Sequence, residues 1–135
     1  MHDRQGFTII ELLLVVVIIG ILAAISIPNY IAMQARAKEA NVMELAHSLQ
    51  MAAEDFAVMN LGLYSDQAAD LTPNLPGGLL VKNPFTGNRT EPQFGAAAAT
   101  PGQVGIVGLM HAGAMEGYTI TGFGMNALVI SYTNG

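Results

Sequence analysis

The chain has 135 residues, no cysteine and a formal net charge of −5 at pH 7. This length predicts about one domain. The lack of cysteine excludes disulfides, thiolate metal sites and a cysteine nucleophile. Only five residues are Lys or Arg, and they form no cluster, so the basic surface typical of a dedicated nucleic-acid binder is missing. We therefore expect no nucleic-acid partner.

Residues 7–28 form an apolar segment in which Glu11 is the only charged residue. As a helix, this segment would be about 33 Å long, which matches the hydrocarbon core of a bilayer at roughly 30 Å. A helix that is apolar on every face does not suit the surface of a small soluble domain. The segment is therefore predicted to lie in lipid or to be surrounded by other protein.

Three other interpretations of this segment are open. It could be a secretory signal peptide, with a small-residue cleavage site at Ala24-Ile25-Ser26. The acidic Glu11 and a leading segment without net positive charge disfavour that interpretation. It could also be a plain single-pass anchor, which leaves the sequence around Gly6 unexplained. A buried helix of a globular core is disfavoured by the length of the segment.

Residues 29–60 change to the pattern of an amphipathic helix. Apolar residues follow one another at steps of three and four, which places them on one stripe of the helix: Val42, Leu45, Leu49, Ala52, Phe56 and Met59. Charged residues such as Glu54 fall off this stripe and are expected to face water or neighbouring subunits. Pro28 should kink or locally open the helix, and Gly20 weakens it by about 1 kcal/mol relative to Ala. We therefore expect one helix from about residue 7 to residue 60.

The start of the apolar segment resembles the cleavage and methylation motif of type IV pilins and pseudopilins, with the run Gly6-Phe7-Thr8-Ile9-Ile10-Glu11-Leu12-Leu13. The resemblance implies that a prepilin peptidase removes residues 1–6 as a leader after Gly6 and methylates the new amine of Phe7. It also implies that Glu11 pairs with the amine of Phe7 in an adjacent subunit. Gly20 and Pro28 stand where these proteins place their helix-weakening residues.

The same resemblance implies a fold and a function. Residues 7–28 would be the transmembrane and filament-core helix, residues 29–60 the amphipathic helix, and residues 61–135 a globular part. The implied fold is α+β, with the long helix packed on a small antiparallel sheet. The chain would be a single-pass precursor in the inner membrane, and then a homo-oligomeric subunit of a helical filament built by an assembly machinery. That filament is either an extracellular pilus or a periplasmic type II secretion pseudopilus.

The part after residue 60 divides into loops and strands. Residues 61–101 are rich in turn formers, with one short strand possible at residues 79–82. Residues 104–111, 118–123 and 127–132 each have the length and the β-branched or aromatic content of a strand. A turn at residues 122–126 would join the last two. Three or four antiparallel strands across the helix stripe would complete the globule.

The sequence shows no catalytic constellation, so we expect no enzymatic activity and no catalytic residues. The histidines His2, His47 and His111 lack metal-ligand spacing. Asp66 and Asp70 offer oxygen ligands of the kind that calcium prefers, although two carboxylates in a loop are more often solvated. No cofactor is therefore expected, with calcium as the one possibility.

Two kinds of filament subunit are compatible with this sequence. The main interpretation is a major pilin or major pseudopilin that assembles through its N-terminal helix. The alternative is a minor or tip pilin that acts as a binding module for DNA, a surface or a secreted substrate. Minor subunits of the family often lack the buried glutamate, so Glu11 favours the main interpretation.

Overall fold

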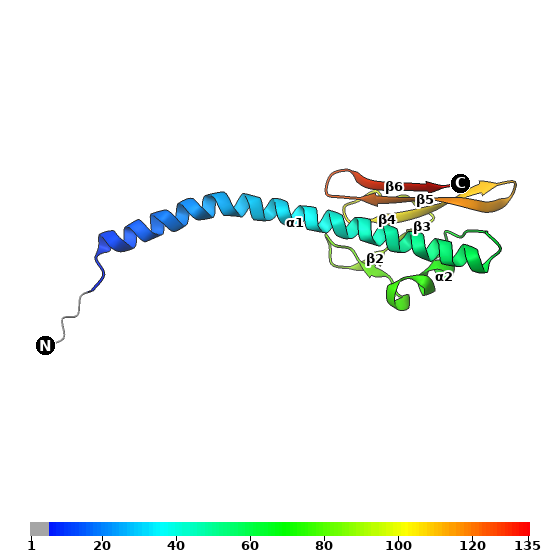
Figure 1. Ribbon diagram of the computed structural model, residues 1–135, viewed down its shortest axis with the longest axis horizontal. Helices are drawn as coiled ribbons and strands as arrows, with labels where there is room; N and C mark the ends of the chain where they lie inside the picture. Colours follow the sequence, from blue (N-terminus) through cyan, green and yellow to red (C-terminus); the bar gives the residue numbers. More distant parts are fainter. Residues whose placement is uncertain (1–5) are drawn as a thin grey trace. The chain divides into compact units, whose positions relative to one another are not determined.

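The computed structural model describes residues 6–135. The chain forms two compact units, residues 1–35 and residues 36–135. Helix α1 (Ile9–Met59) runs through both, and every strand belongs to the second unit (Figure 1). Of the predicted leader, only Gly6 lies among the described residues.

In the first unit, α1 exposes apolar side chains on every face. Leu13 is 61% exposed, Ile18 50% and Ile25 62%. Among the described residues, α1 is the one helix that is long and apolar enough to cross a membrane. Because water solvates such a surface poorly, this unit needs lipid or other protein around it.

The ends of α1 differ slightly from the predicted ends. The helix begins at Ile9 rather than at Phe7, because Thr8 adopts the capping position before it. It ends at Met59, one residue before the predicted end. Pro28 lies inside the helix, so the prediction that it does not end the helix is confirmed.

The second unit contains a four-stranded sheet in the order β3-β4-β5-β6. Its strands are β3 (Gln93–Phe94), β4 (Val104–His111), β5 (Ala114–Phe123) and β6 (Leu128–Asn134). The last three pair antiparallel, as predicted. The expectation of a wholly antiparallel sheet is wrong at one edge, where β3 pairs parallel with β4. Residues 95–103 connect these two strands.

The segment predicted as loops holds more structure than expected. It contains α2 (Ala68–Leu71), the short 3₁₀ helices η1 (Thr72–Asn74) and η2 (Pro76–Gly78), and a two-stranded antiparallel sheet of β1 (Val81–Lys82) and β2 (Arg89–Glu91). The strand expected at residues 79–82 therefore starts two residues later. The strand β2 was not predicted, because three residues with exposed, polar Arg89 and Thr90 carry no strand pattern.

The core of the second unit lies between α1 and the sheet. Val42 and Leu49 of α1 are buried together with Ile106 of β4 and Tyr118 and Ile120 of β5. Figure 1 shows the second part of α1 running alongside these strands.

The predicted stripe on α1 is partly wrong. Leu45 and Phe56 are only half-buried, and Met59 is 68% exposed. The buried positions include Ala46, Ala53 and Ala57, whose small side chains allow the sheet to approach the helix closely. The prediction that Glu54 faces water or a neighbouring subunit is also wrong, because Tyr118 Oη of the same chain donates a hydrogen bond of 2.7 Å to its carboxylate.

Candidate assembly site

The first turn of α1 is closed by a reciprocal pair of hydrogen bonds between Thr8 and Glu11. The backbone N–H of Thr8 donates to Glu11 Oε2 at 2.8 Å, and the backbone N–H of Glu11 donates to Thr8 Oγ1 at 3.3 Å. The Thr8 hydroxyl also donates to Glu11 Oε2 at 2.8 Å. Threonine at the N-cap and glutamate three residues later form a capping box, which satisfies backbone donors at the helix start.

From the sequence, Glu11 was assigned only a partner in another subunit, and its hydrogen bonds to Thr8 were not predicted. The signal was present, because a Thr-x-x-Glu spacing directly before an apolar run is a capping-box signature. Both hydrogen bonds that the Glu11 carboxylate accepts from Thr8 use Oε2. A carboxylate has about four acceptor positions on its two oxygens, so Glu11 can accept a further donor while it caps its own helix.

The predicted processing residues precede this cap. Gly6 and Phe7 are exposed, and Phe7 exposes 79% of its surface. A methyl group in place of a Gly6 hydrogen would meet no atom of the chain within 4 Å. The backbone around the predicted scissile bond is therefore accessible within this chain.

Gly20 and Pro28, the predicted helix-weakening residues, both lie inside α1. A Cβ atom at Gly20 would have no neighbour within 4 Å, so packing within the chain does not require glycine there. Pro28 lacks the N–H that would bond to the preceding turn. Glycine and proline are both poor helix formers, so we expect the two residues to lower the stability of the helix.

Asp66 and Asp70, the two carboxylates that offered possible calcium ligands, both accept hydrogen bonds from groups of the same chain. Asp66 Oδ2 accepts a hydrogen bond from the backbone N–H of Gly108 at 3.1 Å, and Asp70 Oδ2 accepts one from Ser65 Oγ at 2.6 Å. Within residues 6–135, no three His, Cys, Asp or Glu side chains form a metal-binding group. His47 and His111 are exposed, and His2 lies outside the described residues.

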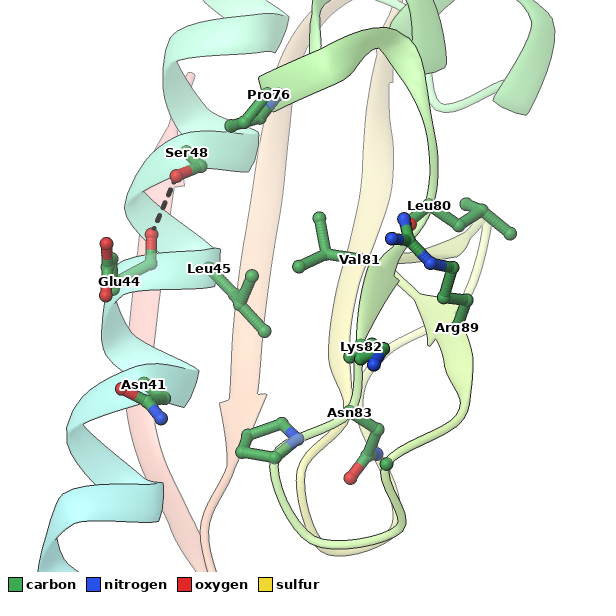
Figure 2. A pocket seen from close by; sticks show the side chains of 12 residues that line it. Asn41, Glu44, Leu45, Ser48, Pro76, Leu80, Val81, Lys82, Asn83 and Arg89 are labelled. Atoms are coloured by element: carbon green, nitrogen blue, oxygen red, sulfur yellow. Dashed lines mark hydrogen bonds between the residues drawn. The ribbon is translucent and has the colours of Figure 1, made fainter.

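A groove of about 670 Å³ lies between α1 and the two-stranded sheet. Figure 2 shows Leu45 of α1 and Val81 of β1 pointing toward each other across it. Polar and charged residues from both walls line it as well, among them Glu44 and Ser48 from α1 and Lys82 and Arg89 from the sheet. No sequence pattern indicated this groove, because its walls come from segments far apart along the chain.

A comparison with known proteins decides the family. The type IV major fimbrial protein FimA of Dichelobacter nodosus is 37% identical over 125 residues, which cover 92% of this chain and 74% of that protein. The chain belongs to the type IV pilin family. The prokaryotic N-terminal methylation motif also matches its residues 1–27.

Other relatives match half of this pilin or less. The type IV major pilin protein PilA of Myxococcus xanthus is 46% identical over 68 residues, which cover 50% of this chain and 30% of that protein. A fimbrial protein of Pseudomonas aeruginosa is 48% identical over 54 residues, covering 40% of this chain and 35% of the relative. No solved structure matches the chain. These relatives are structural pilus proteins, so the pilin chain is not an enzyme.

Proposed function

We propose that the chain is a major subunit of a surface type IV pilus, and that it assembles with identical copies through the N-terminal half of α1. The observation that carries this proposal is the alignment with the major fimbrial protein, which extends over both the helix and the sheet. The matched relatives are named for pili rather than for secretion, which favours a pilus over a periplasmic pseudopilus.

The exposed apolar surface of residues 7–28 supports this mode of assembly. Before assembly, this segment would be held in the inner membrane as a single span. In the filament, the same segments of neighbouring copies would surround one another and replace the lipid. The globular residues 36–135 already bury their own apolar core, so they would form the outer part of the filament.

Processing by prepilin peptidase is part of the proposal. Cleavage after Gly6 would create a positively charged amine on Phe7, four residues before Glu11. An ionised carboxylate in an apolar environment is costly unless it is paired. A neighbour's Phe7 amine would supply that partner and would favour one register between adjacent helices.

Residues 20–28 have a proposed role in the same assembly. Melting this segment would lengthen the chain, because an extended residue rises about 3.3 Å and a helical residue 1.5 Å. The isolated Gly20 and the missing N–H of Pro28 make this the least stable part of α1. Assembly in this scheme needs no cofactor.

The deciding experiment is to express the full chain in bacteria that assemble type IV pili and to shear filaments from the cell surface. We expect the sheared fraction to contain a polypeptide that begins at Phe7 and carries one added methyl group, as measured by mass spectrometry. A mature chain that begins at Ile27 would establish the signal-peptide alternative. Retention of all processed chain in the periplasm would favour a pseudopilus instead.

A further inference from the structure

We propose that the groove between α1 and the two-stranded sheet receives the end of α1 from a second copy of this chain, in a head-to-tail contact. The inference rests on the proposed function, because it names a contact between copies in the filament. The groove is defined by Leu45, Ser48, Pro76, Val81, Lys82 and Arg89. The inserted surface, called the acidic end below, consists of Asp55, Met59, Leu61, Leu63 and Asp70.

The acidic end combines apolar side chains with carboxylates. Leu61 is 99% exposed and Met59 68%, although both are large apolar residues. Met59, Leu61 and Leu63 line one shallow hollow together with Asp70. Asp55 lies one helical turn before Met59 and is exposed.

The backbone holds Leu61 outward. Leu61 has φ = 59°, in the left-handed region that leucine rarely adopts. The N–H of Gly62 donates to the carbonyl of Ala57 at 2.8 Å, which closes the helix end and fixes this conformation. The side chain of Leu61 is therefore free to contact a surface outside its own chain.

The groove wall carries two cations from the two-stranded sheet and one carboxylate, Glu44 of α1, around an apolar floor. Lys82 and Arg89 are register partners in the two-stranded sheet, and both are exposed on the groove wall. Lys38 adds a third cation near the same sheet, because its Nζ lies 5.3 Å from the ring centre of Phe85 in the connecting turn. These cations complement the exposed Asp55 and Asp70 of the acidic end.

A chain cannot fill its own groove with its own acidic end. Leu45 and Met59 are 14 residues apart on one helix, which is about 21 Å along its axis. The two surfaces are therefore different patches of one molecule. A contact between different patches does not close as a two-fold dimer, and it repeats from copy to copy along a helical filament. A second copy of the chain is therefore the occupant that we assign to this groove.

The cysteine-free sequence allows a direct test by crosslinking. The test variant carries Ser48→Cys in the groove and Leu61→Cys in the acidic end. The control variant carries Leu61→Cys with Ser131→Cys, a matched Ser→Cys change at an exposed position on β6. Both full-length variants are assembled on cells, and the sheared filaments are oxidised mildly and separated by non-reducing electrophoresis.

We expect a ladder of crosslinked multimers from the test variant, with at least tenfold more crosslinked chain than from the control. Mixed filaments of the two single variants should give dimers and no longer species. Filaments without a Ser48–Leu61 crosslink would overturn the contact and leave the proposed function standing. Dimers from Leu61→Cys alone would show a symmetric contact and would also overturn it. Failure of the unmodified chain to form filaments would overturn both proposals.

A charge exchange gives a second readout. Lys82→Glu with Arg89→Glu should lower the yield of sheared filaments at least tenfold, and so should Asp55→Lys with Asp70→Lys. Combining all four changes in one chain should restore most of the filament yield. The two groove residues are then negative and the two residues of the other surface positive, so the surfaces still attract each other. A combined variant that assembles no better than either pair, although it melts at the temperature of the unmodified chain, would contradict the contact.

Discussion

Tyr118 of β5 donates a hydrogen bond of 2.7 Å to Glu54 of α1, across 64 residues of sequence. The same carboxylate accepts bonds from Tyr64 Oη at 3.1 Å and from Asn134 Nδ2 at 3.0 Å. Glu54 thus ties the helix to the middle of the sheet, to the loop after the helix and to the last strand. This cluster links the C-terminal strand to α1 in a chain that has no disulfide.

Replacing Glu54 with Ala should lower the free energy of unfolding by about 2–3 kcal/mol, because it leaves the buried hydroxyl of Tyr118 without a partner. The measurement is denaturant unfolding of the full chain in detergent micelles, followed by near-UV circular dichroism. The exposed neighbour Asp55 provides the control, and its replacement with Ala should change the value by no more than about 0.5 kcal/mol. Equal effects of the two changes would contradict the role of Glu54.

The stability of residues 36–135 should fall at alkaline pH. Burial raises the pKa of Tyr118, and its hydrogen bond to Glu54 raises that pKa further. The folded chain therefore holds this proton above pH 10, where the unfolded chain releases it. The contribution of Tyr118 to the free energy of unfolding is fully present below about pH 10. Above that pH it decreases, by at most about 1.4 kcal/mol per pH unit.

The check is unfolding of the unmodified chain and of Tyr118→Phe between pH 8 and pH 11. The phenylalanine variant should be less stable at pH 8, because it loses the hydrogen bond, and should show a shallower decline above pH 10. The same slope in both proteins would exclude Tyr118 as the titrating group.

Glu11 and Thr8 allow the charge of the carboxylate to be separated from its capping role. Glutamine at the third helical position also completes a capping box, so Glu11→Gln keeps the cap and removes the charge. If the charge pairs with a neighbour's amine, this variant should enter filaments at least tenfold less well while its membrane insertion is unchanged. The measurement is the ratio of sheared to membrane-bound chain.

The matched control is Thr8→Ala, which removes the cap and keeps the charge. It should cost the helix start about 1 kcal/mol and should still assemble. Wild-type incorporation of Glu11→Gln together with poor incorporation of Thr8→Ala would show that the cap, and not charge pairing, is what assembly requires.

Glu91 is a buried carboxylate held by three donors. Its Oε1 accepts from Asn83 Nδ2 at 3.1 Å and from Thr90 Oγ1 at 2.9 Å, and its Oε2 accepts from the backbone N–H of Val104 at 3.0 Å. Glu91→Gln should lower the free energy of unfolding by about 2–3 kcal/mol, because the new amide group must face at least one of these donors. The exposed Glu44→Gln is the control, with a change within about 0.5 kcal/mol in the same unfolding assay.

Gly20→Ala tests the proposed melting of residues 20–28. Alanine fits without a clash and stabilises a helix by about 1 kcal/mol relative to glycine. In filaments of the unmodified chain, amides of this segment should exchange with deuterium faster than those on either side. The variant should slow that exchange about fivefold, as measured by mass spectrometry. Equal protection along the whole helix in unmodified filaments would exclude melting.

The local features of this pilin could be predicted from sequence because each depends on neighbouring residues. The apolar segment 7–28 is evident from composition alone, and the bounds of β4 match the predicted strand at both ends. The amphipathic pattern of α1 could also be recognised, although the predicted stripe left out the buried Ala46, Ala53 and Ala57. Small residues contribute little to a hydrophobic pattern, and their burial depends on how closely the sheet approaches.

What the sequence alone determined is the long helix, the apolar segment and the motif around Glu11, since these follow from composition and spacing along one element. Only the tertiary structure decided that Glu54 binds Tyr118, that Glu91 is buried beside Asn83, and that Leu45 and Val81 face each other across a groove. Each of these contacts joins segments whose distance in space depends on how all the strands pack on α1. A pattern within a single segment carries no information about that packing.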